Sequence, residues 1–428
     1  MAKIGIIGGS GLDDPELLRD YQEITIETPY GNPSSNIIVG KIKDIEVCIL
    51  SRHGKKHEIP PTQVNNRANI YALKKLGCTH IVSTTAVGSL REKIKRGDFV
   101  ILDQFIDFTR HREISFYEKF DSNEGAKHTP MAKPFSAELR QKLIQACRDF
   151  NFPHHEKGTV VTIEGPRFST IAESNIFRMW GADVINMSIA PEVILANEAG
   201  IPYASIAMST DYDCWKQDEE PVSWEAVLEI FNKNAEKVKQ VLVKTIESFS
   251  PESRNSFIKN KIRTIPNFPK QGIMFRDITT LFKDSDGIKE VAEIFYGRYK
   301  NSRIDIVAGI ESRGFIVGGI LAEKLKCGFV PIRKKGKLPA EKESQEYNLE
   351  YGTDIIEIHK DAISFGQRIL LVDDLIATGG TAEAACKLIE KLGGKIVECA
   401  FIVNLPALRG MERISKYPAF SIVEFEGE

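Results

Sequence analysis

Two adjacent carboxylates and a glycine–threonine turn stand close together near the C-terminal end of the sequence. Asp373 and Asp374 come first, and the turn that follows consists of Ala377, Thr378, Gly379, Gly380 and Thr381. Glycines carry no Cβ, so backbone N–H groups can turn inward around an anion, and threonine hydroxyls add further donors. The pattern predicts a phosphate-binding turn at the start of a helix, whereas glycines alone would indicate only tight packing between a strand and a helix.

The apolar pattern on both sides predicts the elements that position this turn. Residues 369–372 form an unbroken run of branched apolar side chains, typical of a strand buried on both faces of a parallel sheet. The acidic pair would then follow the carboxyl end of that strand, where open α/β sheets hold their ligands. A helix follows, with an apolar face at Ala385, Leu388, Ile389 and Leu392.

In the N-terminal half, polar and basic side chains accompany three further predicted strands. Ser10 lies in a glycine turn after the strand 3–7, Arg52 and His53 follow the strand 46–50, and Thr85 lies near the end of the strand that begins at His80. An arginine can hold phosphate with a forked pair of charged hydrogen bonds. A solvated basic turn or simple turn geometry is the alternative at each place, and the convergence of three strand ends favours phosphate.

Length and composition indicate an ordinary enzyme of two domains. The chain has 428 residues, more than one hydrophobic core usually serves. With 57 basic and 59 acidic residues it shows no charge excess that would favour nucleic acid or an anionic membrane. Seven cysteines without metal spacing, and no apolar run near the roughly 18 residues of a membrane span, predict a cytoplasmic protein. The polar stretch 248–256 is the expected seam between domains 1–249 and 250–428.

Six ordered blocks in residues 1–245 carry a family resemblance: GIIGGSGLDD, RHG, STTAVGS, IEGPRFS, GADVINMS and STDYDCW. They resemble the S-methyl-5′-thioadenosine phosphorylases of the trimeric purine nucleoside phosphorylase superfamily, which implies an α/β domain with a twisted mixed sheet. The resemblance also implies that Ser10, Arg52, His53, Thr85 and Ser188 hold inorganic phosphate. It places Met187 under the ribose, Phe168 against the purine, and Asp211 and Asp213 at the nucleoside.

Asp211 has a chemical role that can be argued from the reaction. When phosphate attacks the anomeric carbon, the purine departs with negative charge, and an acid at N7 relieves it. A carboxyl group can donate to N7 and accept from the 6-amino group of adenine, whereas asparagine would better suit a 6-oxopurine. Such an acid contributes about 10²–10⁴ in rate, and its pKa must lie above the usual value of about 3.9. A capped surface turn is the structural alternative.

The resemblance extends to further residues of the expected nucleoside pocket. His57 and His128 match positions that line the pocket in the family, although a single histidine is often structural. The helix expected at 224–248 brings the bulky Trp224 beside Val227, where the family has small apolar residues around the 5′-methylthio group. This departure leaves the nature of the 5′-substituent open.

The second half, through GIMFRDI, GIESRGF, PIRKKGKLP, LEYG and VDDLIATGGT, resembles adenine phosphoribosyltransferase, a type I phosphoribosyltransferase with a doubly wound parallel sheet. In that family the acidic pair holds the ribose hydroxyls of phosphoribosyl pyrophosphate (PRPP), and the glycine–threonine turn holds its 5′-phosphate. The resemblance implies that Met274, Phe275 and Arg276 bind adenine. It assigns the pyrophosphate to Arg313, Arg333, Lys334 and Lys337.

Residues 335–351 have the polar composition of a mobile lid, and Glu350 matches the residue that handles the adenine proton in the family. Mg²⁺ is expected on pyrophosphate and ribose oxygens, mainly through water and substrate, and no protein metal site is predicted.

Together the two halves suggest a bifunctional purine-salvage enzyme. The first would release adenine from S-methyl-5′-thioadenosine, and the second would join adenine to PRPP to give AMP and pyrophosphate. The alternatives are a 6-oxopurine nucleoside phosphorylase in the first half and a PRPP-sensing regulator in the second. The expected partners are these small-molecule substrates, with no nucleic acid and no membrane. Trimers in one family and dimers in the other favour a homo-oligomer.

Overall fold

The computed structural model describes residues 2–8, 18–120, 125–216, 218, 223–348 and 353–426. The chain divides into two compact units, Met1–Ser250 and Pro251–Glu428, which are called here the N-terminal and the C-terminal unit. Among the residues described, no helix has the length and the apolar character that a membrane crossing requires.

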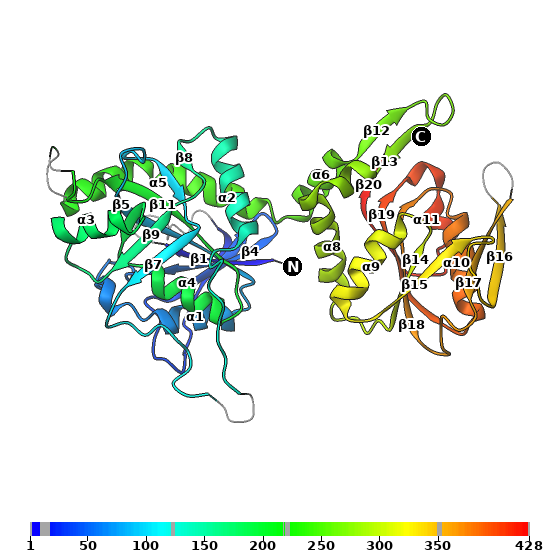
Figure 1. Ribbon diagram of the computed structural model, residues 1–428, viewed down its shortest axis with the longest axis horizontal. Helices are drawn as coiled ribbons and strands as arrows, with labels where there is room; N and C mark the ends of the chain where they lie inside the picture. Colours follow the sequence, from blue (N-terminus) through cyan, green and yellow to red (C-terminus); the bar gives the residue numbers. More distant parts are fainter. Residues whose placement is uncertain are drawn as a thin grey trace. The chain divides into compact units, whose positions relative to one another are not determined.

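In its described residues, the N-terminal unit is built on an 11-stranded sheet with five helices around it (Figure 1). Its strands are β1 (Lys3–Gly8), β2 (Arg19–Ile24), β3 (Ile37–Ile42), β4 (Ile45–Ser51), β5 (His80–Ser89), β6 (Phe99–Ile101), β7 (Gln104–Phe108), β8 (His154–His155), β9 (Thr159–Ile163), β10 (Val184–Asn186) and β11 (Tyr203–Asp211). Its helices are α1 (Asn66–Lys75), α2 (Ala137–Asp149), α3 (Ile171–Met179), α4 (Ile189–Glu198) and α5 (Trp224–Glu247).

The centre of this sheet determines where polar side chains meet. Strand β5 pairs in parallel with β1 and β11 and antiparallel with β10, and β1 pairs in parallel with β4. Gly8 lies opposite Ser51 in this register, and Ala207 lies opposite Thr85. The carboxyl ends of β1, β4, β5 and β11 therefore lie at one edge, and the expectation of a mixed sheet is confirmed.

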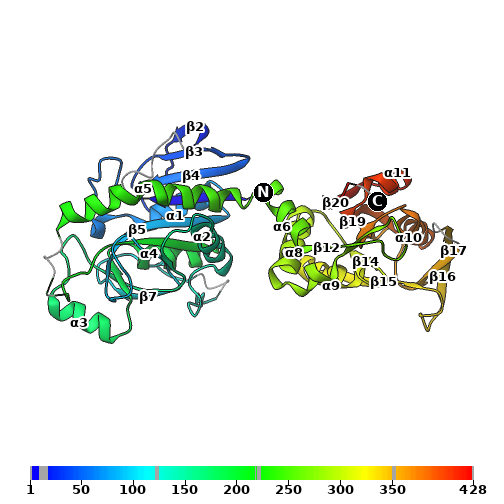
Figure 2. The same cartoon turned by 90° about the horizontal axis from the view of Figure 1, so that it is seen from above.

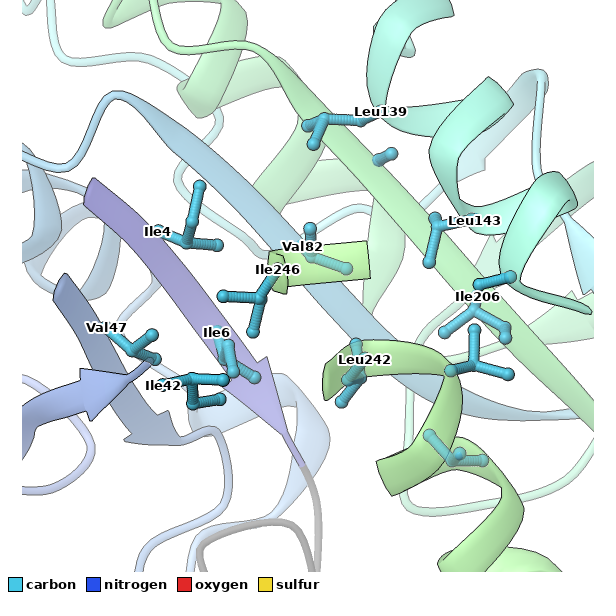
Figure 3. Packing of buried hydrophobic residues seen from close by; sticks show 14 of the residues in the cluster. Ile4, Ile6, Ile42, Val47, Val82, Leu139, Leu143, Ile206, Leu242 and Ile246 are labelled. Atoms are coloured by element: carbon cyan, nitrogen blue, oxygen red, sulfur yellow. The ribbon is translucent and has the colours of Figure 1, made fainter. Parts of the chain in front are cut away.

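The core of this unit fills both faces of the sheet. Helices α2 and α5 cover one face, and Figure 3 shows Leu242 and Ile246 of α5 near Ile6 of β1. Helices α1 and α4 contribute to the apolar cluster on the other face. Figure 2, which views the molecule from above, shows that α5 runs along the sheet. Each fully buried leucine or isoleucine stabilises the fold by about 1.5–3 kcal/mol, so the strand edge that carries polar groups is held by a large core.

Over the residues that the structure describes, the C-terminal unit contains a 7-stranded sheet, a separate two-stranded ribbon and six helices. Its strands are β12 (Arg263–Pro266), β13 (Met274–Asp277), β14 (Ile306–Ile310), β15 (Gly328–Lys334), β16 (Lys342–Asn348), β17 (Thr353–His359), β18 (Arg368–Ile376), β19 (Lys395–Asn404) and β20 (Ala419–Glu424). Its helices are α6 (Pro251–Lys261), α7 (Thr279–Lys283), α8 (Ser285–Tyr299), α9 (Gly314–Leu325), α10 (Gly380–Lys391) and α11 (Gly410–Arg413).

Strand β18 lies within the parallel part of this sheet, in the order β16-β17-β15-β14-β18-β19-β20. Ile369 and Leu371 pack with α10 on one face, and Leu370 and Val372 pack with α8 and α9 on the other. Because successive residues of a strand point to opposite faces, the unbroken apolar run reflects burial on both sides. The doubly wound parallel sheet is confirmed, with β17 and β16 added antiparallel at one edge.

Three local expectations differ from the structure. Strand β18 continues to Ile376, so the acidic pair lies within the strand, because pairing with β19 extends to Asn404. Residues Lys342–Asn348 of the expected lid form β16, since all seven pair with β17 and Tyr347 is buried. The expected seam, residues 248–256, lies largely in helix α6. Pro251 can begin this helix because the first turn of a helix does not need the N–H group that proline lacks.

Candidate active sites

A pocket opens at the carboxyl edge of the N-terminal sheet. The residues that line it include Arg52, His53, His57, Thr85, Gly88, Phe168, Ser169, Asn186, Met187, Ser188, Thr210, Asp211, Asp213, Val227, Leu228 and Phe231. The structure thus brings together the N-terminal side chains assigned to phosphate and nucleoside, apart from Ser10, which lies outside the described residues. Sequence reasoning missed Asn186 and Ser169, whose partners Thr85 and Asp213 lie far away in the chain, and it missed Thr210, although Thr210 directly precedes Asp211.

A cluster of hydroxyl groups forms one wall of this pocket. The Thr85 Oγ1 and Ser188 Oγ atoms are 3.1 Å apart, and Asn186 Nδ2 lies 3.2 Å from the first and 3.4 Å from the second. Ser188 is the residue before α4, and its hydroxyl makes no capping bond to that helix. A helix N-terminus with hydroxyl donors beside it is a suitable place for phosphate.

The guanidinium fork of Arg52 binds the carboxylate of Glu192 in α4. Nε contacts Oε1, Nη2 lies 3.1 Å from Oε2, and Nη1 donates to the carbonyl oxygen of Thr84 at 2.8 Å. In this structure Glu192 thus occupies the guanidinium fork, and phosphate binding by Arg52 stays a prediction. Because the Arg52 side chain is only 3% exposed, it needs a fixed counter-charge. Arg52 still lines the pocket, where it contributes positive charge and one remaining Nη1 proton.

His53 is a neutral side chain beside this pair. Its Nδ1 lies 2.9 Å from the carbonyl oxygen of Ile59, which can only accept, so Nδ1 carries the proton. Burial, together with the positive charge of Arg52, lowers the pKa of His53 to about 4. Near neutral pH, Nε2 is then an acceptor, suited to the hydroxyl of a hydrogen phosphate ion.

Asp211 lies at the end of β11 on the same pocket. Its carboxyl oxygens accept from the Thr210 hydroxyl at 2.7 Å and from the backbone N–H of Asp213 at 2.8 Å. Burial raises the pKa of Asp211 despite these two donors. A Cβ at Gly88 would lie 2.8 Å from Asp211 Oδ1, so glycine is required for this carboxyl to sit where it does.

Asp213 is held by Ser169 from the loop before α3. The Ser169 hydroxyl lies 2.6 Å from Oδ1 and 2.7 Å from Oδ2 of Asp213. Asp213 itself has φ 50°, a left-handed conformation that aspartate adopts more readily than most residues. The surface-turn alternative does not fit, since both aspartates are buried at the pocket wall.

The remaining wall is apolar. Phe168 and Met187 line the pocket together with Val227, Leu228 and Phe231 of α5. The side chain of Trp224 lies outside the described part of the structure. The His57 ring lies over His53, with centroids 4.6 Å apart, whereas His128 is exposed next to Phe120 and does not line the pocket of its own chain.

The C-terminal unit has a pocket at the carboxyl edge of its parallel strands. Its lining includes Glu311, Ser312, Arg313, Lys334, Lys337, Tyr347, Asp354, Asp373, Asp374, Ala377, Thr378, Gly379, Gly380 and Thr381. Burial and the neighbouring Asp374 raise the pKa of Asp373, and Arg313 Nε lies 2.8 Å from Asp374 Oδ2. The acidic pair and the turn therefore meet in one cavity with three of the four expected cations, Arg313, Lys334 and Lys337, whereas Arg333 is not among the lining residues.

The glycine–threonine turn depends on close backbone contacts. Gly379 has φ 76° and directly precedes α10, and a Cβ on it would lie 2.5 Å from the carbonyl oxygen of Gly410. Only glycine fits both restrictions.

The four cations expected around pyrophosphate are all paired with carboxylates. Arg333 and Lys337 contact Glu311, Arg313 contacts Asp374, and Lys334 Nζ lies 3.4 Å from Asp354 Oδ2. This balance of charge was not expected from sequence, because Glu311 and Asp354 had no assigned role.

The residues expected to bind adenine lie on the two-stranded ribbon. Met274, Phe275 and Arg276 belong to β13, which pairs antiparallel with β12, and they are not among the residues that line the pocket. The Phe275 ring packs edge-on against Phe268, with centroids 5.2 Å apart. Glu350 lies outside the described residues.

In the part of the chain that the structure describes, neither unit shows a protein cage for a metal ion. Within the described ranges, no group of three or more histidine, cysteine, aspartate or glutamate side chains is arranged to hold one. Asp374 Oδ2 is nevertheless buried without a well-aligned hydrogen bond, and such an oxygen suits water or a cation carried by a substrate.

Comparison with known families assigns both units. The model of the phosphorylase superfamily matches residues 3–247, and the model of the phosphoribosyl transferase domain matches residues 277–428. Two curated relatives named S-methyl-5′-thioadenosine phosphorylase are 53% identical over 265 residues (Xenopus tropicalis) and 49% identical over 273 residues (Drosophila melanogaster). They cover 61% and 64% of this chain and 94% of each relative.

Solved structures give the same result for the first unit. Methylthioadenosine phosphorylase from Schistosoma mansoni in complex with adenine is 47% identical, with a TM-score of 0.55, over 58% of this chain and 91% of that one. A mutant of the adenosine/methylthioadenosine phosphorylase from the same organism, in complex with methylthioadenosine, is 45% identical, with a TM-score of 0.54, over the same shares.

Proposed function

The chain belongs to the phosphorylase superfamily and carries a phosphoribosyl transferase domain in residues 277–428, and from this premise we propose that it is a bifunctional purine-salvage enzyme. The N-terminal unit converts S-methyl-5′-thioadenosine and phosphate to adenine and 5-methylthioribose 1-phosphate. The C-terminal unit converts adenine and PRPP to AMP and pyrophosphate. Because the product of the first reaction is a substrate of the second, the two families make chemical sense in one chain.

The observation that carries the first reaction is a buried carboxyl group, Asp211, in the pocket that holds the hydroxyls of Thr85 and Ser188. An oxygen of phosphate forms a bond to C1′ while the bond from C1′ to N9 breaks, and that electron pair passes to the purine. The raised pKa of Asp211 keeps a proton available for N7. Its other oxygen accepts from the 6-amino group of adenine.

The apolar residues of α5 support S-methyl-5′-thioadenosine as the substrate. Val227, Leu228 and Phe231 line the pocket and offer no side-chain hydrogen bond to a 5′-hydroxyl. A methylthio group is apolar and loses nothing on burial there, whereas a hydroxyl without a partner costs about 1–3 kcal/mol.

The second reaction is supported by the meeting of Asp373, Asp374 and the 377–381 turn in one pocket. The acidic pair accepts from the ribose hydroxyls of PRPP, and the turn donates to its 5′-phosphate. N9 of adenine then bonds to C1 as pyrophosphate leaves, and Glu350 is proposed to take the adenine proton. The four cations are already paired with carboxylates, so they neutralise the diphosphate charge only in part. Mg²⁺ bound to the diphosphate would supply the remaining neutralisation.

Assembly and location extend this proposal. We expect a homo-oligomer, because the two families form trimers and dimers, respectively, and His128 is exposed away from its own pocket. We also expect a cytoplasmic location, consistent with cysteines that form no disulfide in the described residues.

Rates with a panel of substrates test the assignment of each unit. S-methyl-5′-thioadenosine should be cleaved faster than adenosine and much faster than inosine, each with phosphate. Adenine should be joined to PRPP in preference to hypoxanthine or guanine. Faster cleavage of inosine would support a 6-oxopurine phosphorylase, and tight binding of duplex DNA without AMP synthesis would support a PRPP-sensing regulator.

A further inference from the structure

The sheet of the C-terminal unit fixes Glu311 beside the expected pyrophosphate cations. Ile310 of β14 lies opposite Ile332 of β15 in a parallel register, so the next residue of each strand, Glu311 and Arg333, are neighbours. The backbone N–H of Glu311 donates to the carbonyl oxygen of Ile332 at 2.9 Å, which extends the ladder by one residue. Glu311 is therefore held by the strands themselves and not by a mobile loop.

Three donors converge on the Glu311 carboxylate. Arg333 Nε lies 3.3 Å and the backbone N–H of Lys334 3.0 Å from Oε2, and Lys337 Nζ contacts Oε1. The side chain of Glu311 is 9% exposed and lines the pocket that contains the acidic pair and the glycine–threonine turn. A phosphoryl group would be bound by the same arrangement, in which two cations and a backbone N–H surround a pair of anionic oxygens.

We propose that Glu311 occupies the diphosphate position in the unliganded protein, and that PRPP or pyrophosphate binds by taking Arg333 and Lys337 away from it. This inference rests on the phosphoribosyltransferase function proposed above. The Glu311 carboxylate then competes with pyrophosphate for these two cations, which weakens pyrophosphate binding and favours pyrophosphate release.

The state of Glu311 supports this exchange. Burial alone would raise its pKa, but the hydrogen bonds from Lys337, the Lys334 backbone and Arg333 hold the pKa below its ordinary value. The group is thus an anion near neutral pH, where it can compete with a diphosphate.

If Glu311 instead supported diphosphate binding, its removal would change the affinity for diphosphate in the opposite direction. If Glu311 served to align Arg333 and Lys337 for the ligand, its loss would scatter the cations and weaken diphosphate binding. If it competes, its loss leaves the two cations unpaired and strengthens binding. The direction of one affinity change therefore separates the two roles.

Glu311→Gln is the informative substitution, because the amide keeps the size of the side chain and an oxygen that accepts from the Lys334 N–H. The full chain would be titrated with inorganic pyrophosphate in a calorimeter, with and without Mg²⁺. We expect roughly threefold to tenfold tighter binding than in the wild type, with a steeper loss of affinity as salt is added. Glu311→Ala, which also removes the charge, should shift the affinity in the same direction.

Glu293→Gln is the matched control, since Glu293 pairs with Lys324 at 2.8 Å and neither residue lines the pocket. It should leave the affinity for pyrophosphate unchanged. A folded Glu311→Gln protein that binds pyrophosphate equally or more weakly would overturn the exchange while leaving the proposed function intact. A wild-type chain that binds neither pyrophosphate nor PRPP would overturn the proposed function, and the exchange with it.

Discussion

The guanidinium of Arg52 and the carboxylate of Glu192 form an enclosed ion pair at the pocket of the N-terminal unit, with 3% and 0% of their side chains exposed. Tyr203 donates a further hydrogen bond to Glu192 at 2.8 Å, and Ser83 lies 2.6 Å from the Tyr203 hydroxyl. The charge that faces the pocket from Arg52 is thus set by a chain of buried partners. This arrangement makes Glu192 as important as the residues that touch a ligand.

Glu192→Gln should destabilise the N-terminal unit by about 3–5 kcal/mol, because it leaves the buried charge of Arg52 without a counter-charge. All three tryptophans, at 180, 215 and 224, lie in this unit, so tryptophan fluorescence during urea unfolding reports on it alone. Glu247→Gln, which alters a partly exposed pair with Lys43, should change stability by less than about 1 kcal/mol. Equal effects of the two substitutions would contradict the importance of the buried pair.

Asp211→Asn should lower phosphorolysis of S-methyl-5′-thioadenosine by about 10²–10⁴, because the amide cannot transfer a proton to N7. AMP synthesis from added adenine is the internal control and should keep its wild-type rate. In the wild type, phosphorolysis should also fall as pH rises through the raised pKa of Asp211, because the carboxyl then loses its proton. The assignment fails if the substituted chain retains both the rate and this alkaline decline.

His53 should make the N-terminal unit less stable in mild acid. Its pKa falls from 6.5 to about 4 in the folded chain, so between these values the unfolded state binds the extra proton and stability rises with pH. The unfolding free energy should therefore drop by about 1–3 kcal/mol as pH is lowered from 7 to 4. His53→Gln should lose this part of the pH dependence, and His111→Gln, at an exposed site, should keep it. An unchanged profile in His53→Gln would refute the assignment.

Gly379→Ala should impair PRPP binding more than a matched glycine substitution elsewhere. Both Gly379 and Gly366 have positive φ, 76° and 82°, but only at Gly379 would a Cβ meet backbone, at 2.5 Å. Gly366→Ala should cost only the conformational strain of about 1 kcal/mol. In adenine-dependent AMP synthesis, Gly379→Ala should raise the KM for PRPP at least about tenfold. Similar KM values for the two variants would show that the turn tolerates a side chain.

The parts of the fold that depend on local pattern could be predicted from sequence. Burial of β18 on both faces follows directly from the run 369–372, and the acidic pair and the turn follow within a few residues. Partners that meet only through folding could not be predicted in this way. Glu192 lies in a helix that is otherwise mostly apolar, so nothing nearby indicates that it binds the Arg52 fork.

Composition alone does not show the contacts that pairing across strands creates. The polar segment that contains Tyr347 has the composition of a lid, yet its backbone is satisfied by β17 and its tyrosine is buried. Similarly, Arg333 and Lys337 suggest an open anion site in sequence, whereas the register of β14 and β15 brings Glu311 between them. At each place pairing between strands, and not residue type, determined the outcome.

The most direct test follows S-methyl-5′-thioadenosine labelled in its purine ring through the purified full chain, with phosphate, PRPP and Mg²⁺ present. Labelled AMP should form only when both phosphate and PRPP are supplied. Asp211→Asn should leave the label in the starting nucleoside, and Asp374→Asn should leave it in adenine. Label that reaches AMP in the Asp211→Asn chain, or a wild-type chain that yields neither adenine nor AMP, would contradict the two-site account.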